Sequence, residues 1–175
     1  GFRNPTITNH SWGYGWDLSE TFPGGFVIGD ITQIIHRGTT YNASNPGPSG
    51  WTMAGIETDF GIGASKTSLP SDYAALRADV EDAIEDGVVV IGAAGNDNLV
   101  IADPSDADWN NTINWDYDGS PRTEPYMRGA WPNSPDNDSI IVGALSNRHN
   151  FTRSFFTMHG PGVDVFAPGQ RIVSC

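Results

Sequence analysis

The chain has 175 residues and a formal net charge of −12, with nine basic residues against 21 acidic ones. Hydrophobic residues make up 38% and charged residues 17%, a composition that predicts a globular domain and excludes a disordered chain. The excess of acidic residues argues against binding to nucleic acid or to a membrane surface, because both require basic patches.

Neither end of the sequence looks like a natural terminus. Gly1 is not an initiator methionine, and the sequence ends within an apolar strand pattern at residues 172–175. We therefore expect the chain to be a piece of a longer protein. The single cysteine, Cys175, allows no disulfide within the chain, and no apolar run is long enough to span a bilayer.

The first half of the chain predicts short strands separated by turns. Residues 6–13 indicate a strand that runs into a glycine turn, and residues 14–70 are rich in loops. Within that segment, residues 26–35 and 39–41 are candidate strands, and the Pro- and Gly-rich residues 45–50 form a turn cluster.

A helix followed directly by a buried strand is the clearest pattern in the sequence. Residues 71–86 carry apolar side chains on one helical face, with Ser71 as a cap and Gly87 as the stop. Residues 88–91 are a β-branched run of the kind that parallel sheets bury on both faces. The pair is therefore half of a parallel α/β unit.

Further strands are expected towards the end of the chain. Residues 139–145 contain a second buried strand, and residues 163–166 and 171–173 are shorter candidates. Residues 97–138 form a long segment rich in Asp, Asn and Pro, which we expect to be mostly loop.

The segment from Gly92 to Asn96 carries the chemical signal. Small residues at the carboxyl end of a buried strand let another chain approach the backbone, and ligands bind at that end of open α/β sheets. An asparagine there can donate its side-chain amide to a developing negative charge, as in an oxyanion hole. The alternative is a plain turn, in which Gly95 supplies a positive φ and Asn96 only shapes the loop.

Four blocks in fixed order resemble the subtilisin-like serine proteases, the subtilases. The chain as a whole is similar to the central part of such a domain, and the four blocks make up 39 of its 175 residues. The blocks are residues 9–13 (Asn-His-Ser-Trp-Gly), 87–96 (Gly-Val-Val-Val-Ile-Gly-Ala-Ala-Gly-Asn), 139–146 (Ser-Ile-Ile-Val-Gly-Ala-Leu-Ser) and 154–169, which ends in Val-Asp-Val-Phe-Ala-Pro-Gly.

The resemblance implies an α/β fold of the three-layer subtilisin type with a mainly parallel sheet. Residues 1–175 would be an incomplete domain of this kind, with residues 14–70 and 97–138 mostly inserted loops. In the family the catalytic Asp and His precede the first block, and the nucleophilic Ser follows the last. The chain alone is therefore expected to be inactive. Its expected partners are the missing N- and C-terminal parts of the same protein, either continuous with it or associated with it as separate chains.

The resemblance also implies roles for individual residues. Asn96 would be the oxyanion donor, and the backbone of Ser11, Trp12 and Gly13 would pair with a peptide or protein substrate as an added strand. One wall of the substrate pocket would be formed by Ala93, Ala94 and Gly95. The reaction would be acyl transfer to a serine followed by hydrolysis, without a required cofactor.

Three near-matches to catalytic motifs lie inside the segment 14–70. His36-Arg37-Gly38-Thr39 is close to His-Gly-Thr, Asp59 lies in a sequence close to Asp-Thr-Gly, and Thr52 stands where Gly-Thr-Ser-Met-Ala would have its serine. Their order along the chain differs from that of the family. We therefore expect no triad within the chain, although triads are defined by geometry and not by order.

The acidic segment 103–119 has oxygen-bearing side chains at alternating positions, which calcium favours, and subtilases often bind calcium. The glycine and glutamate register of an EF-hand is missing, so a solvated loop is the favoured interpretation, with calcium as the alternative. No histidine pair has zinc-motif spacing, and no metal site is assigned.

A different class of function stays open beside the protease. The chain could belong to a subtilase-fold structural or adhesion domain that has lost catalysis, with the inserted segments as contact surfaces. In either case we expect an extracellular, secreted or virion-associated protein.

Overall fold

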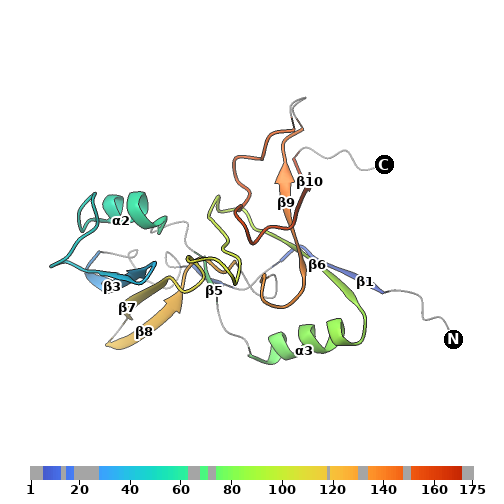
Figure 1. Cartoon of the computed structure of the whole chain (residues 1–175), viewed down its shortest axis with the longest axis horizontal. Helices are drawn as coiled ribbons and strands as arrows, with labels where there is room; N and C mark the ends of the chain where they lie inside the picture. The colour runs from blue at the N-terminus through green and yellow to red at the C-terminus, as the bar shows by residue number, and fades with distance from the viewer. Residues whose placement is uncertain are drawn as a thin grey trace.

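A computed structural model describes residues 6–12, 15–17, 28–62, 68–70, 74–117, 119–129, 134–147 and 151–170. Ten strands, two α-helices and a short 3-10 helix are assigned within them (Figure 1). In chain order they are β1 Ile7–His10, β2 Gly15–Asp17, η1 Ile28–Asp30, β3 Ile31–His36, β4 Thr39–Tyr41, α2 Met53–Phe60, β5 Ser68–Pro70, α3 Ala74–Glu85, β6 Val89–Ala93, β7 Thr112–Tyr117, β8 Ser120–Pro125, β9 Ile140–Leu145 and β10 Val165–Pro168.

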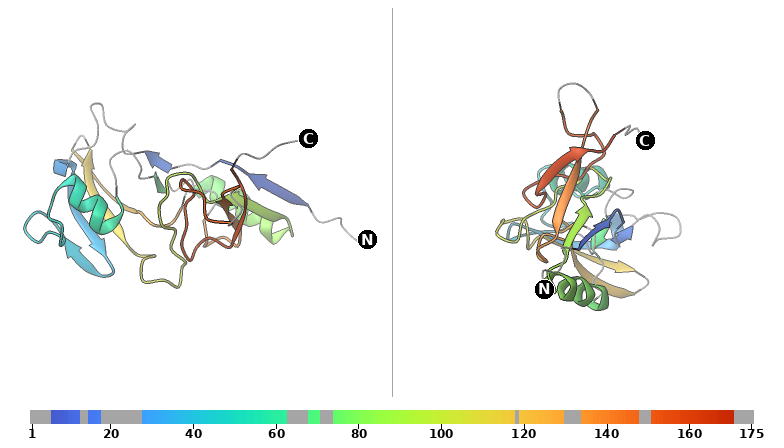
Figure 2. Two further views of the ribbon diagram at one scale, coloured as in Figure 1. Left: turned by 90° about the horizontal axis from the view of Figure 1, so that it is seen from above. Right: turned by 90° about the vertical axis from the view of Figure 1, so that its right-hand side faces the viewer.

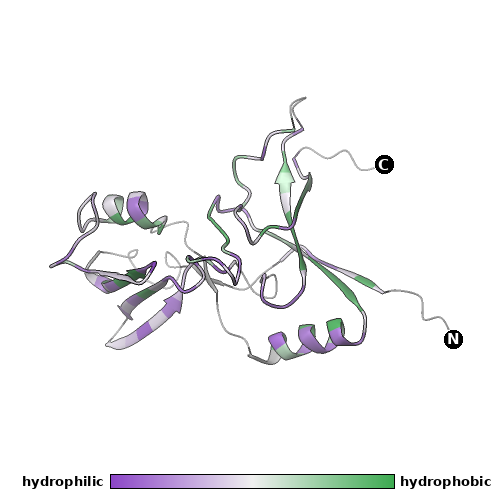
Figure 3. Cartoon of the chain, in the orientation of Figure 1, coloured by the Kyte–Doolittle hydropathy of each residue, from purple (hydrophilic) through white to green (hydrophobic). Residues whose placement is uncertain are grey.

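Four strands form a parallel sheet in the order β1-β6-β9-β10. All three pairings in this sheet are parallel, with Thr8 opposite Val90 and Gly92 opposite Ile141. The predicted α/β fold with a mainly parallel sheet is confirmed. Figure 3 shows why the sequence pattern was informative, because β6 carries hydrophobic residues along its length.

Helix α3 leads directly into β6, as the sequence predicted. It ends where Val88 donates a backbone hydrogen bond of 2.9 Å to the carbonyl oxygen of Ala83, and its side chain at Val80 is buried. In Figure 3 the helix alternates hydrophilic and hydrophobic residues, which is typical of a helix with one solvated face. The expected cap, Ser71, lies outside the described residues.

The two faces of the parallel sheet differ in how they are covered. One face is buried, and there Ile141 packs in a core cluster with Ile101, Met158 and Val163. The register places another set of apolar side chains on the opposite face, and these are exposed among the described residues: Ile7, Val89, Ile140 and Val165. A sheet face of this composition is normally buried against a further layer.

The segments 14–70 and 97–138 contain more regular structure than the sequence indicated. They contribute an antiparallel sheet in the order β4-β3-β7-β8, accompanied by α2. Its core contains Ile34, Ile56, Ile113 and Trp115, all with no exposed surface. In Figures 1 and 2 (left view) this sheet and α2 lie at one end of an elongated molecule, and the parallel sheet and α3 at the other.

Other expected strands were found close to their predicted positions. The strand predicted within residues 139–145 is β9, Ile140–Leu145, and the one expected at residues 163–166 is β10, Val165–Pro168. The candidate at residues 171–173 lies outside the described residues. No helix among the described residues is long and apolar enough to cross a bilayer.

Candidate functional site

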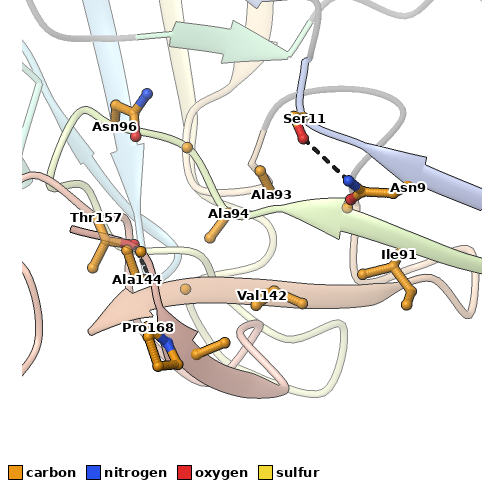
Figure 4. Close-up of a pocket in the computed structure, with 15 residues that line it drawn as sticks. Asn9, Ser11, Ile91, Ala93, Ala94, Asn96, Val142, Ala144, Thr157 and Pro168 are labelled. Carbon is orange, nitrogen blue, oxygen red and sulfur yellow. Dashed lines mark hydrogen bonds between the residues drawn. The ribbon is translucent and has the colours of Figure 1, made fainter. Parts of the chain in front are cut away.

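A pocket of about 350 Å³ lies at the carboxyl ends of the parallel strands (Figure 4). Five of the residues predicted for the site line it, namely Ser11, Ala93, Ala94, Gly95 and Asn96. The other lining residues are Asn9, Ile91, Gly92, Val142, Gly143, Ala144, Thr157, Ala167, Pro168 and Gly169. The sheet therefore brings together segments that are up to about 160 residues apart in the sequence.

The floor of this pocket belongs to the uncovered face of the parallel sheet. Asn9 is opposite Ile91, and Ala93 is opposite Val142, so all four side chains point to the same side as Ile140 and Val165. The pocket is consequently open where a further layer of the protein would lie.

Among the described residues of the predicted substrate-binding strand, Trp12 is not part of the pocket lining. Trp12 is 46% exposed, and its ring lies against that of His10 with the centroids 5.4 Å apart. Gly13 lies outside the described residues. Ser11 does line the pocket, and its hydroxyl oxygen accepts a hydrogen bond of 3.4 Å from the amide of Asn9.

Asn96 lies three residues beyond the end of β6, at the margin of the pocket. Ala94 still follows the sheet, because its backbone N–H donates to the carbonyl oxygen of Val142 over 2.9 Å. At Gly95 the backbone turns with φ of +109°, a conformation that favours glycine. The side chain of Asn96 is exposed, so its amide is available to a bound molecule.

The loop that carries Asn96 is held by the segment after β9. The backbone N–H of Met158 donates to the carbonyl oxygen of Gly95, and the N–H of Asn98 donates to that of Phe156. Further along, Leu99 accepts from His159, and Ile101 donates to the same residue over 2.7 Å. These bonds fix the backbone on both sides of Asn96.

Thr157 is a site residue that the sequence did not single out. Its side chain is almost fully buried, and its hydroxyl oxygen accepts a hydrogen bond of 2.9 Å from the N–H of Ala144 (Figure 4). The same hydroxyl donates to the carbonyl oxygen of Met158. Thr157 lies within residues 154–169, one of the four blocks that resemble the family. The resemblance of this block did not indicate which of its side chains would reach the pocket.

The lining residues provide hydrogen bonds and apolar surface, but no group for proton transfer. The polar side chains among them are Asn9, Ser11, Asn96 and Thr157, and none of these titrates near neutral pH. The hydroxyl of Ser11 is paired with Asn9, not with a base. Among the described residues, the pocket lining therefore offers amide and hydroxyl groups for hydrogen bonding and contains no carboxylate, imidazole, thiol or amine side chain.

The near-matches to catalytic motifs have structural roles. The Nδ1 atom of His36 lies 2.7 Å from the Tyr126 hydroxyl, and the carboxylate of Asp59 accepts hydrogen bonds from the N–H and hydroxyl of Ser49. Thr52 caps α2, where its hydroxyl oxygen accepts from the N–H of Gly55 over 3.0 Å. Among the described residues, these three groups bond to separate partners and not to one another.

The acidic loop directs its carboxylates to different partners. Asp103 accepts from Ser105, Asp106 accepts from the N–H of Asp108, and Asp108 itself binds Arg37. Within the described residues, no group of three or more His, Cys, Asp or Glu side chains could hold a metal ion.

Comparison with known proteins gives a consistent result. The model of the subtilase family matches residues 3–174. Alkaline protease 1 of Emericella nidulans is 35% identical over 144 residues, which cover 82% of this chain and 27% of that protein. A subtilisin-like protease of Coccidioides posadasii is 31% identical over 96 residues, or 55% of this chain and 16% of that protein. The chain thus spans about a quarter or less of the length of these relatives.

Proposed function

Because this chain belongs to the subtilase family, we propose that it supplies the oxyanion donor and the substrate-binding strand of a serine endopeptidase. The observation that carries the proposal is the position of Asn96. Its exposed amide lies at the end of a parallel strand, at the margin of a pocket that Ser11 also lines. The fold and family are established independently of this role.

In peptide-bond hydrolysis a serine attacks the carbonyl carbon, and the carbonyl oxygen gains negative charge in the tetrahedral intermediate. The proposal assigns Asn96 Nδ2 as a donor to that oxygen. A donor held in place by the protein stabilises the charge without reorganisation during the reaction, and loss of one such donor lowers turnover by about 10²–10³-fold.

The same proposal assigns substrate binding to the residues around the pocket. The backbone at Ser11, Trp12 and Gly13 would pair with an extended peptide, as in strand addition. Ala93, Ala94 and Gly95 would form one wall of the pocket for the residue before the scissile bond. Their small side chains support this assignment, since they leave the backbone accessible along that wall.

The catalytic triad is proposed to come from segments of the same protein that flank this chain, either continuous with it or as associated chains. Two observations support this. The pocket contains no nucleophile–base pair among the described residues, and the pocket floor continues into an exposed apolar sheet face. On this proposal the chain alone does not cleave peptides. We further propose an extracellular enzyme, in keeping with a net charge of −12.

The test uses the longest natural chain that contains residues 1–175. We expect a serine-directed fluorophosphonate to label it, and Asn96→Leu to lower kcat by about 10²-fold or more with little change in KM. Asn110→Ala is the matched control, because Asn110 is also exposed but does not line the pocket.

Unchanged turnover in Asn96→Leu would exclude the oxyanion role. Absence of labelling in a folded full-length protein would instead support the alternative of a structural domain that has lost catalysis.

A further inference from the structure

We propose that Arg153 is a positioning residue for Asn96, which acts on the loop and does not touch the substrate. This inference rests on the proposed oxyanion role of Asn96. It concerns which residues hold the loop that carries the Asn96 amide, and the oxyanion role alone does not identify them.

The need for such a residue follows from the surroundings of Asn96. Its side chain is exposed and makes no hydrogen bond to any other residue within the described part of the chain. The backbone conformation of residues 95–98 therefore sets the point and direction from which this side chain projects into the pocket. Any group that fixes this backbone therefore restricts the positions that the donor can reach.

Arg153 connects that loop to the turn beside the pocket. Its Nη1 atom donates to the side-chain oxygen of Asn98 over 2.9 Å and to the carbonyl oxygen of Thr157 over 3.2 Å. Thr157 lines the pocket and is 1% exposed, so one end of this connection is rigid. A single guanidinium nitrogen thus joins the loop to a fixed point of the site.

Asn98 is a suitable point of attachment because its backbone is in a restricted conformation. Its φ is +54°, in the left-handed region that few residues other than glycine adopt, although asparagine tolerates it. Its backbone N–H also donates to the carbonyl oxygen of Phe156 over 2.8 Å. Residue 98 is held through both its backbone and its side chain, two positions after Asn96.

The other side of Asn96 is fixed by the same segment. Met158 donates its N–H to the carbonyl oxygen of Gly95 over 3.1 Å. Residues 153–158 therefore hold the loop immediately before and shortly after Asn96. The backbone of Arg153 forms an antiparallel bridge to Leu145, the last residue of β9. The parallel sheet therefore holds Arg153 in position beside the loop.

The test measures kcat and KM separately for Arg153→Ala in the longest natural chain that contains residues 1–175. We expect kcat to fall about tenfold with KM nearly unchanged, less than for Asn96→Leu, because the donor is still present but populates other orientations. Arg153→Lys should retain part of the activity. Arg77→Ala is the control and should leave kcat unchanged, because Arg77 is a partly exposed arginine of α3 that pairs with Glu81 and Asp136 and does not line the pocket.

Asn98→Gly is a second variant that removes the same hydrogen bond while keeping Arg153 in place. Glycine accepts the φ of +54° but removes the oxygen that Arg153 binds, so it should reproduce the loss seen in Arg153→Ala. If Arg153→Ala does not fold, this variant still tests the contact.

A double-mutant cycle separates positioning from general stability. If Arg153 acts through Asn96, Arg153→Ala has no further effect on kcat once Asn96→Leu is present. A tenfold loss in both backgrounds, or unchanged kcat in Arg153→Ala and Asn98→Gly while Asn96→Leu is impaired, overturns this inference alone. Unchanged kcat in Asn96→Leu overturns the proposed function and the inference with it.

Discussion

Arg37 donates two hydrogen bonds to Asp108, from Nε to Oδ1 and from Nη2 to Oδ2, each of 2.7 Å. The pair joins the turn between β3 and β4 to the loop before β7, 71 residues away in the sequence. Asn111 completes the contact, because it donates to Asp108 Oδ1 and accepts from the backbone N–H of Arg37. This two-point geometry is the strong form of an arginine–carboxylate interaction.

Replacing Asp108 by asparagine tests how much this contact stabilises the antiparallel sheet. The side chain of Asp108 is 12% exposed, whereas that of Arg37 is 61% exposed and can be solvated when the pair is broken. We therefore expect Asp108→Asn to lower the free energy of unfolding by about 1–2 kcal/mol, the range for hydrogen bonds to a charged group. Urea denaturation measures it, with Asp82→Asn on α3 as an exposed control. Equal midpoints for the two variants would show that the contact contributes nothing.

The same cluster predicts an acid-dependent loss of stability in two stages. Burial lowers the pKa of His36 below 6.5, against an opposing effect of Asp108 and a further lowering by Arg37. The hydrogen bonds from Arg37 are the largest cause that lowers the pKa of Asp108 from 3.8 to about 2. In both cases the unfolded chain binds the proton more readily than the folded chain, so stability falls as the pH decreases.

The expected free energy of unfolding is therefore highest above about pH 6.5, where both groups have lost their protons in the folded and the unfolded state. It decreases first as His36 takes up a proton, and again from pH 3.8 towards 2 as Asp108 does. Denaturation at a series of pH values measures this. His36→Gln should remove most of the first decrease and Asp108→Asn most of the second. A curve that is identical in His36→Gln would exclude a contribution from His36.

Trp115 should be the most costly tryptophan to truncate among those the structure describes. It has no exposed surface and packs in the core between the antiparallel sheet and α2. Trp115→Ala is expected to lower the free energy of unfolding by about 3–5 kcal/mol through lost burial and a remaining cavity. Trp12→Ala, at a side chain that is 46% exposed, should change it by less than about 1 kcal/mol. Comparable losses in the two variants would contradict the packing described.

The parts of the fold that the sequence predicted are those with a local signal. The strand β6 and the helix α3 follow from an apolar run and from helical spacing over adjacent residues. The strands β7 and β8 lack such a signal, because β7 is half polar and β8 contains Pro121 and Pro125. They form because β7 pairs with β3, some 80 residues earlier, and buries Ile113 and Trp115 there.

The residues of the candidate site also differ in whether a local sequence signal predicts them. Asn96 and the small residues before it could be located from the end of a buried strand and from the family resemblance. Arg153 and Thr157 could not, since their contacts exist only after the segment following β9 folds back beside the loop of Asn96. Hydrogen bonds between segments far apart in the sequence carry no periodicity, so a sequence pattern does not reveal them.

Gly95→Ala tests the last element of the site, the close approach of the Asn96 loop to Met158. A Cβ on Gly95 would lie 2.5 Å from the sulfur of Met158, and the φ of +109° adds strain for any side chain. We expect the variant to lose about 2–4 kcal/mol of stability, from strain and overpacking together. On the proposed function, the longest natural chain that contains residues 1–175 should also lose much of its turnover. Gly50→Ala separates the two causes, because Gly50 has a comparable φ of +86° with nothing within 4 Å of a Cβ, and should lose only about 1 kcal/mol with unchanged turnover. Shortening the neighbour in Gly95→Ala/Met158→Ala should relieve the contact but not the backbone strain. If Gly95→Ala and Gly50→Ala are equally mild in stability and in turnover, the contact with Met158 does not constrain the loop.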